Sequence, residues 1–136
     1  MKLQKLVFFM HAWSLALSGE TVVKETPEAW QYGPVFDSLY HSLKGYGSRN
    51  IDTYLQEMNP TTGQREPLIP NQQDTHFWNL LAQVWARYGG LSALQLSALT
   101  HEDGSPWATA KEERRGWLDD KQVADFYRQK LTAHAG

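Results

Sequence analysis

The first part of the chain carries apolar side chains at helical spacing. From Leu3 to Leu17, apolar positions recur every three or four residues, and the opposite face is largely apolar as well. Gly19 follows as a helix stop. A helix that is apolar nearly all round belongs inside a bundle, so we predict a buried N-terminal helix. His11 lies within it, and we expect a hydrogen-bonded core histidine there rather than a catalytic one.

Four further segments show the apolar stripe of an amphipathic helix. They span residues 35–44, 75–88, 92–99 and 119–131. Asp74 or Thr75 can cap the second of these helices, and Ser92 with Gln95 matches a capping box for the third. One of two adjacent aspartates can cap the last helix. Together with the N-terminal helix, these segments predict about five helices.

A short β-ribbon is predicted near residues 21–32. Residues 21–23 are β-branched, and residues 29–32 place Trp30 and Tyr32 in alternation with smaller or polar side chains. In an extended segment this alternation puts both rings on one side. Large amphipathic rings either cover a core or contribute to an interface, and both roles stay open for these two.

The dipeptide Gly33-Pro34 indicates a turn. Glycine permits backbone angles that a side chain would penalise, and proline fixes φ near the helical value, so we predict that the next helix begins at Pro34. The prolines and Gly63 within residues 57–73 exclude a long helix there and indicate a connecting loop. The expected fold is mainly α: a compact bundle of about five helices around the N-terminal helix, as a single domain spanning residues 1–136.

Composition narrows the classes of function. A length of 136 residues suits one compact domain, and the absence of cysteine excludes disulfides and thiolate zinc sites. A net charge of −2 gives no basic field for a phosphate backbone, which disfavours nucleic-acid binding. We expect no membrane span, since one needs about 20 consecutive apolar residues, and we expect a cytoplasmic protein.

Motifs for catalysis or metal binding are not recognisable in the sequence. The five histidines include no pair one helical turn apart, and there is no glycine-rich phosphate loop or nucleophile elbow. A hydrolase built from His101 with Asp103 or Ser105 stays open, although the sequence indicates no oxyanion or base geometry. The mixed charges of residues 111–115 are typical of a solvated face. We therefore expect no catalytic residue, no metal and no cofactor.

Several blocks of the sequence resemble the Panacea domain, the family that contains SocA-like antitoxins and phage-associated GepA-like proteins. The blocks are KLQKL at residues 2–6 with residues 12–19, EAWQYGPV at residues 28–35 with residues 39–47, and LS, LTH and SPW within residues 96–107. Their order matches the family, and they cover most of the chain up to Trp107. Residues 108–136 are expected to form a variable C-terminal segment of the same domain.

The resemblance implies a non-enzymatic antitoxin that binds a cognate protein toxin directly, often a small alarmone-synthetase-like enzyme. The SocA branch resembles a proteolytic adaptor that delivers its toxin to a cytosolic unfolding protease. Members usually carry a helix ahead of the KLQKL block; if that helix covers Phe8 or Phe9, we expect an apolar patch there that favours a homodimer or a partner. Aromatic and adaptable polar groups on loops dominate interfaces, which makes five residues our partner-binding candidates. These candidates are Trp30, Tyr32, Tyr46, His101 and Trp107.

Two other classes of function stay open beside the antitoxin. One is a small hydrolase or nucleotide-processing enzyme centred on His11 and His101. The other is a DNA-binding autoregulator, which predicts strongly salt-dependent binding to its own promoter.

Overall fold

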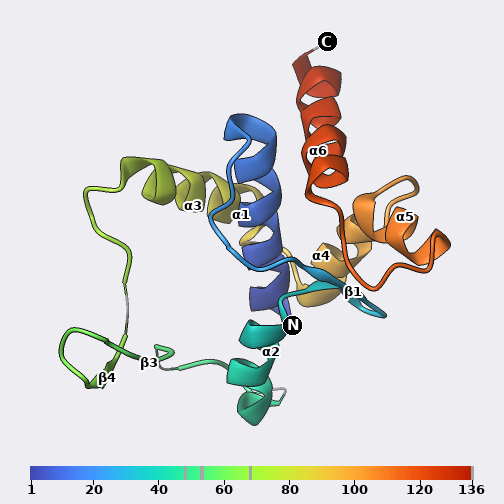
Figure 1. Ribbon diagram of the computed structural model, residues 1–136. Coiled ribbons are helices and arrows are strands. Elements are labelled where there is room, and N and C mark those ends of the chain that lie inside the picture. Colours follow the sequence, from blue (N-terminus) through green and yellow to red (C-terminus); the bar gives the residue numbers. More distant parts are fainter. Residues whose placement is uncertain (48, 53, 68, 136) are drawn as a thin grey trace.

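The computed structural model describes residues 1–47, 49–52, 54–67 and 69–135, and it is mainly helical (Figure 1). The helices are α1 (Lys2–Ser18), α2 (Asp37–Leu43), the 3₁₀ helix η1 (Lys44–Tyr46), α3 (Thr75–Tyr88), α4 (Ala93–Thr100), α5 (Pro106–Glu112) and α6 (Asp120–Ala135). The strands are β1 (Glu28–Trp30), β2 (Gly33–Val35), β3 (Glu57–Met58) and β4 (Arg65–Glu66). The predicted fold class is confirmed, with six α-helices in the described residues in place of about five.

Helix α1 forms the centre of the molecule, as predicted. It runs through the middle of the view in Figure 1, with α3 on one side and α6 on the other, and it also contacts α4 and β2. Phe8 and Phe9 are buried, and Phe9 stacks on Tyr88 of α3 with ring centroids 4.0 Å apart. The apolar patch expected at these two residues was therefore wrong, because other parts of the chain cover both rings. Gly19 ends the helix with a φ of 75°, a conformation that favours glycine.

The β-ribbon lies later in the chain than expected. Strands β1 and β2 pair antiparallel, with Trp30 opposite Gly33, whereas residues 21–23 form no strand. The helix start predicted at Pro34 was wrong, because Pro34 lies inside β2 and α2 begins at Asp37. A proline is tolerated in such a short strand because its fixed φ also fits extended backbone. Tyr32 lies in the tight turn, so the expected extended segment through residue 32 was also wrong.

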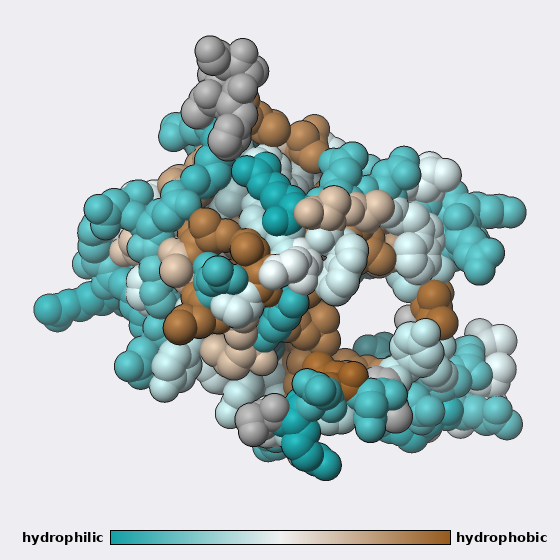
Figure 2. Space-filling model, turned by 180° about the vertical axis from the view of Figure 1, so that it is seen from behind, coloured by the Kyte–Doolittle hydropathy of each residue, from teal (hydrophilic) through white to brown (hydrophobic). Residues whose placement is uncertain are grey.

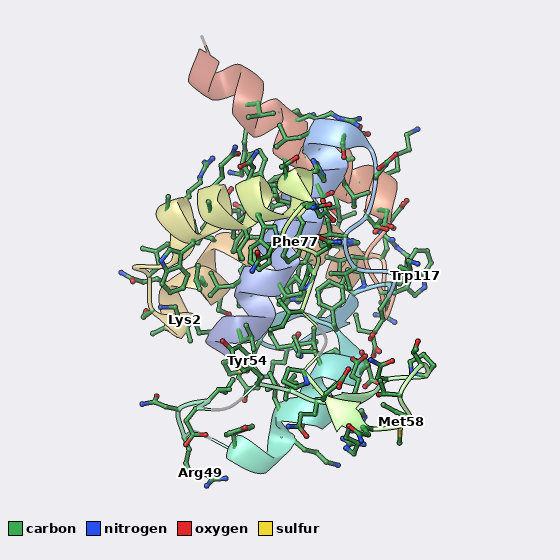
Figure 3. The ribbon with its side chains drawn as sticks, turned by 90° about the vertical axis from the view of Figure 1, so that its left-hand side faces the viewer. Lys2, Arg49, Tyr54, Met58, Phe77 and Trp117 are labelled. Carbon is green, nitrogen blue, oxygen red and sulfur yellow. The ribbon has the colours of Figure 1, made fainter. Side chains whose placement is uncertain are left out.

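A segment near the C-terminus covers the outer edge of the ribbon. The Ala29 amide donates to the Gly116 carbonyl at 2.9 Å, and the Leu118 amide donates to the Pro27 carbonyl at 2.9 Å. Leu118 is fully buried, while Trp117 is half exposed at the side of the molecule in Figure 3. The chain after α5 is therefore part of the same packed unit.

The described residues 49–52, 54–67 and 69–73, which we call the arm, extend away from the helices. Figure 1 shows the β3–β4 hairpin standing off the helical body, and Figure 2 shows an opening between the two. Tyr54 and Met58 are exposed in the arm (Figure 3), whereas Phe77 at the start of α3 packs against the core. Residues 57–73 lie in the predicted connecting loop, and the small hairpin within it was not foreseen.

Local capping signals explain where the later helices begin. The Asp74 side chain accepts a hydrogen bond from the Phe77 amide, and Ser92 and Gln95 form the predicted capping box. Helix α5 was missed, although Ser105 caps it and Pro106 occupies its first turn, a strong start signal. No helix in the described ranges combines the length and the apolar character that crossing a bilayer requires.

Candidate functional site

Residues from the first two sequence blocks meet at the N-terminal end of α1. The Gln4 side chain satisfies both backbone groups of Phe36: its Nε2 donates to the carbonyl at 3.0 Å, and its Oε1 accepts from the amide at 3.0 Å. At the next residue, the Lys5 ammonium group donates to the Pro34 carbonyl at 3.2 Å. Two side chains of α1 therefore fix the position of β2 and of the chain that enters α2.

Lys5 is fully buried, which is rare for a lysine. Desolvation lowers the pKa of its ammonium group to about 8, because burial penalises the charged form. Lys5 was not among the residues predicted from the sequence to form a site. Its position was nevertheless informative, since Lys5 lies three and four residues before Phe8 and Phe9 on the buried face of a nearly all-apolar helix.

Gly33 is required by the way three elements converge. Its φ is 121°, and a Cβ built at this position lies 2.8 Å from Lys5 Cε and 2.8 Å from Thr100 Oγ1. Real Cβ atoms essentially never approach so closely. The backbone of the ribbon turn is thus pressed against α1 and the C-terminal end of α4, and glycine provides the space.

An aromatic surface covers this contact point. The rings of His101 and Trp107 stack with centroids 3.8 Å apart and an interplanar angle of 12°. Trp107 Nε1 donates to the Trp30 carbonyl at 2.6 Å, and the Trp30 ring lies edge-on to Tyr40 at 4.8 Å. Ser97 Oγ donates to the Tyr32 carbonyl at 2.6 Å, while the Tyr32 side chain is 61% exposed.

Four of the five predicted partner-binding residues therefore belong to one surface. We call Trp30, Tyr32, His101 and Trp107 the aromatic surface. Tyr46 is not part of it, because it lies at the end of η1 and lines a pocket between α2 and the arm. Whether any of the five contacts a partner stays a prediction.

The electrostatic environment keeps His101 neutral. Burial lowers the pKa of its imidazole, the nearby Lys5 and Lys111 charges lower it further, and the Tyr32 backbone acts in the opposite direction. His101 Nε2 is buried and has no hydrogen-bond partner among the described residues. The aromatic surface thus consists of three partly buried rings, one of them an imidazole in its neutral form, beside the exposed ring of Tyr32.

Ser105 and His11, two of the residues proposed for an enzyme, are engaged in structural contacts. Ser105 Oγ accepts from the Ala108 amide at 3.1 Å and donates to the Thr100 carbonyl at 2.9 Å, and Ser105 is buried. His11 is buried elsewhere on α1, where its Nε2 lies 3.0 Å from Asp120 Oδ1, as expected for a hydrogen-bonded core histidine. Within the described ranges, no three histidine or acidic side chains are grouped so that they could hold a metal ion.

Comparison with known proteins identifies the source of these blocks. The model of the family "Antitoxin SocA-like, Panacea domain" matches residues 3–108, which include α1, the ribbon, α4 and the start of α5. The chain is 32% identical over 106 residues to the antitoxin SocA of Caulobacter vibrioides (strain NA1000 / CB15N), over 77% of this chain and 55% of that protein. The chain thus spans about half the length of this curated relative. No solved structure matches significantly. The blocks that build the aromatic surface and its buried lysine therefore lie within the family match, and the chain belongs to the SocA-like antitoxins that carry a Panacea domain.

Proposed function

We propose that this chain neutralises a protein toxin by direct, stoichiometric binding, and that the aromatic surface is the main contact. The observation that carries the proposal is the convergence of separate family blocks on one surface, above Lys5 and Gly33. A fold that needed these blocks only for its core would not require an exposed tyrosine in the middle of one block.

The aromatic surface suits protein binding for two physical reasons. The stacked rings of His101 and Trp107, and the hydrogen bond from Trp107 to the Trp30 carbonyl, hold the rings in place before a partner arrives. Little side-chain entropy is then lost on binding. The imidazole is neutral at pH 7, so covering it removes no charge from water.

The test is coexpression with the product of the neighbouring gene in a bacterial host. We expect that product to arrest growth alone, and we expect the intact chain to restore growth and to copurify with it. Tyr32→Ala removes an exposed ring without touching the core and should weaken binding about 30-fold, the size of a hot-spot truncation. Tyr54→Ala, which removes another exposed tyrosine from the arm, is the matched control and should bind normally.

The amount of toxin distinguishes occlusion from delivery to a protease. Under occlusion the toxin accumulates in a stable complex with the chain. Under the adaptor mechanism its half-life falls when the chain is present, and it recovers in a host that lacks the unfolding protease. Failure to restore growth together with failure to copurify would contradict the proposed function.

A further inference from the structure

A second surface lies on another part of the helical body, between α3 and α6. Both helices pack against α1, and a pocket remains between them. Its floor includes Trp13 of α1, its walls include Leu80 of α3 and Leu131 of α6, and Leu17 lies at its rim. Leu17 and Leu131 are 52% and 39% exposed, so the pocket presents apolar side chains to solvent.

A second pocket continues the first along α3. It shares Arg87 and Tyr88 with the first pocket and extends towards Leu91, Leu99 and Lys130. The two pockets adjoin at Arg87 and Tyr88, and together we call them the α3–α6 groove. The Trp13 indole donates to the Tyr88 hydroxyl at 2.8 Å, so the polar groups of the floor are already paired and its remaining surface is apolar.

Arg87 gives the groove an unbalanced positive charge near its middle. The guanidinium lies 5.0 Å from the Trp13 ring and 5.6 Å from the Tyr88 ring, and the side chain is exposed. In the part of the chain that the structure describes, no carboxylate lies within ion-pair distance of Arg87. Lys130, the other cation of the groove, is already paired with Glu102 at 2.8 Å.

We propose that the α3–α6 groove binds an amphipathic helix of the toxin, with an acidic residue of that helix paired to Arg87. Two helical walls on a helical floor fit a further helix, whose apolar stripe fills both ends of the groove while a carboxylate meets the guanidinium. The inference rests on the proposed function and adds a second contact outside the aromatic surface. Charge complementarity selects an acidic helix over a neutral or basic one.

The experiment uses the complex with the neighbouring gene product and measures hydrogen exchange and affinity. In the complex, amides of α3 and α6 should exchange more slowly than in the free chain. Arg87→Glu should weaken binding at least tenfold, whereas Lys121→Glu, an exposed change on α6 that lines neither pocket, should leave the affinity unchanged. Changing one acidic residue of the protected toxin helix to lysine should restore binding to the Arg87→Glu variant.

The outcomes separate this inference from the proposed function. A complex that protects only the aromatic surface and tolerates Arg87→Glu would overturn the groove proposal and leave neutralisation by binding intact. Absence of any complex would overturn both. If the free chain forms a dimer that protects α3 and α6, and the toxin leaves this protection unchanged, the occupant is a second copy and the proposal is wrong.

Discussion

Replacing Gly33 by alanine tests whether the ribbon turn is locked against α1 and α4 by steric contact. The substitution adds one methyl group at a backbone φ of 121°, where L-residues are rarely found. The same methyl group would lie 2.8 Å from both Lys5 Cε and Thr100 Oγ1. Thr100 is buried at the end of α4, so it cannot move aside without disturbing the core.

The expected loss has two parts. Holding a non-glycine residue in a sparsely populated backbone region costs about 1–3 kcal/mol. Overpacking a buried contact by one methyl group adds about 1–3 kcal/mol. Gly33→Ala should therefore lower the free energy of unfolding by about 2–6 kcal/mol, a large fraction of the roughly 5–15 kcal/mol typical of a domain.

Urea denaturation followed by tryptophan fluorescence measures this loss, with Gly104→Ala as the matched control. Gly104 has a φ of 78°, and its added Cβ meets nothing within 4 Å, so this variant carries the backbone cost alone, about 1–2 kcal/mol. Gly33→Ala should be the more destabilising of the two by at least about 1 kcal/mol. Equal losses would refute the steric argument, because the backbone preference alone would then account for Gly33.

Two further predictions concern buried polar groups on α1. Burial lowers the pKa of Lys5 from its ordinary value of 10.5 to about 8 in the folded chain. The unfolded chain therefore binds more protons between these values, and the free energy of unfolding should rise with pH there. In the intact chain, Lys5 should raise the free energy of unfolding by about 2–3 kcal/mol between pH 7 and pH 10, and Lys5→Met should abolish this rise. Urea denaturation at a series of pH values measures it, and an unchanged slope in the variant would contradict the assignment. The comparison stays below pH 10 because burial raises the pKa values of Tyr88 and Tyr127, whose opposing contribution begins there. Asp120→Ala leaves the buried His11 Nε2 unpaired and should lower the free energy of unfolding by about 1–3 kcal/mol in the same assay. Asp120→Asn retains an acceptor and should lower it less. Equal losses for the two variants would show that the hydrogen bond is unimportant.

The aromatic surface shows how far partner-binding residues can be predicted from residue type alone. Trp30, His101 and Trp107 were chosen because rings and polar groups near loops favour interfaces, and the structure brings them together. Tyr46 met the same criterion and lies elsewhere, next to the arm. The type of a residue says nothing about which other residues lie near it, so it could not distinguish the aromatic surface from the pocket beside the arm.

The family and much of the local structure could be predicted from the sequence alone. The all-round apolar pattern before Gly19 required a buried helix, Ser92 with Gln95 specified a helix start, and the blocks up to Trp107 identified the Panacea domain. These features depend on neighbours within a few residues or on the order of short blocks, and a single sequence contains both kinds of information.

How the blocks meet could not be predicted from the sequence. Local preference placed Pro34 at a helix start, but pairing with Ala29 makes it part of a strand. The space for Gly33 is set by Lys5 and Thr100, which lie on different helices. Such contacts join residues far apart in the sequence, and periodicity and turn chemistry act only over a few residues. The position of the aromatic surface above a buried lysine therefore follows from packing.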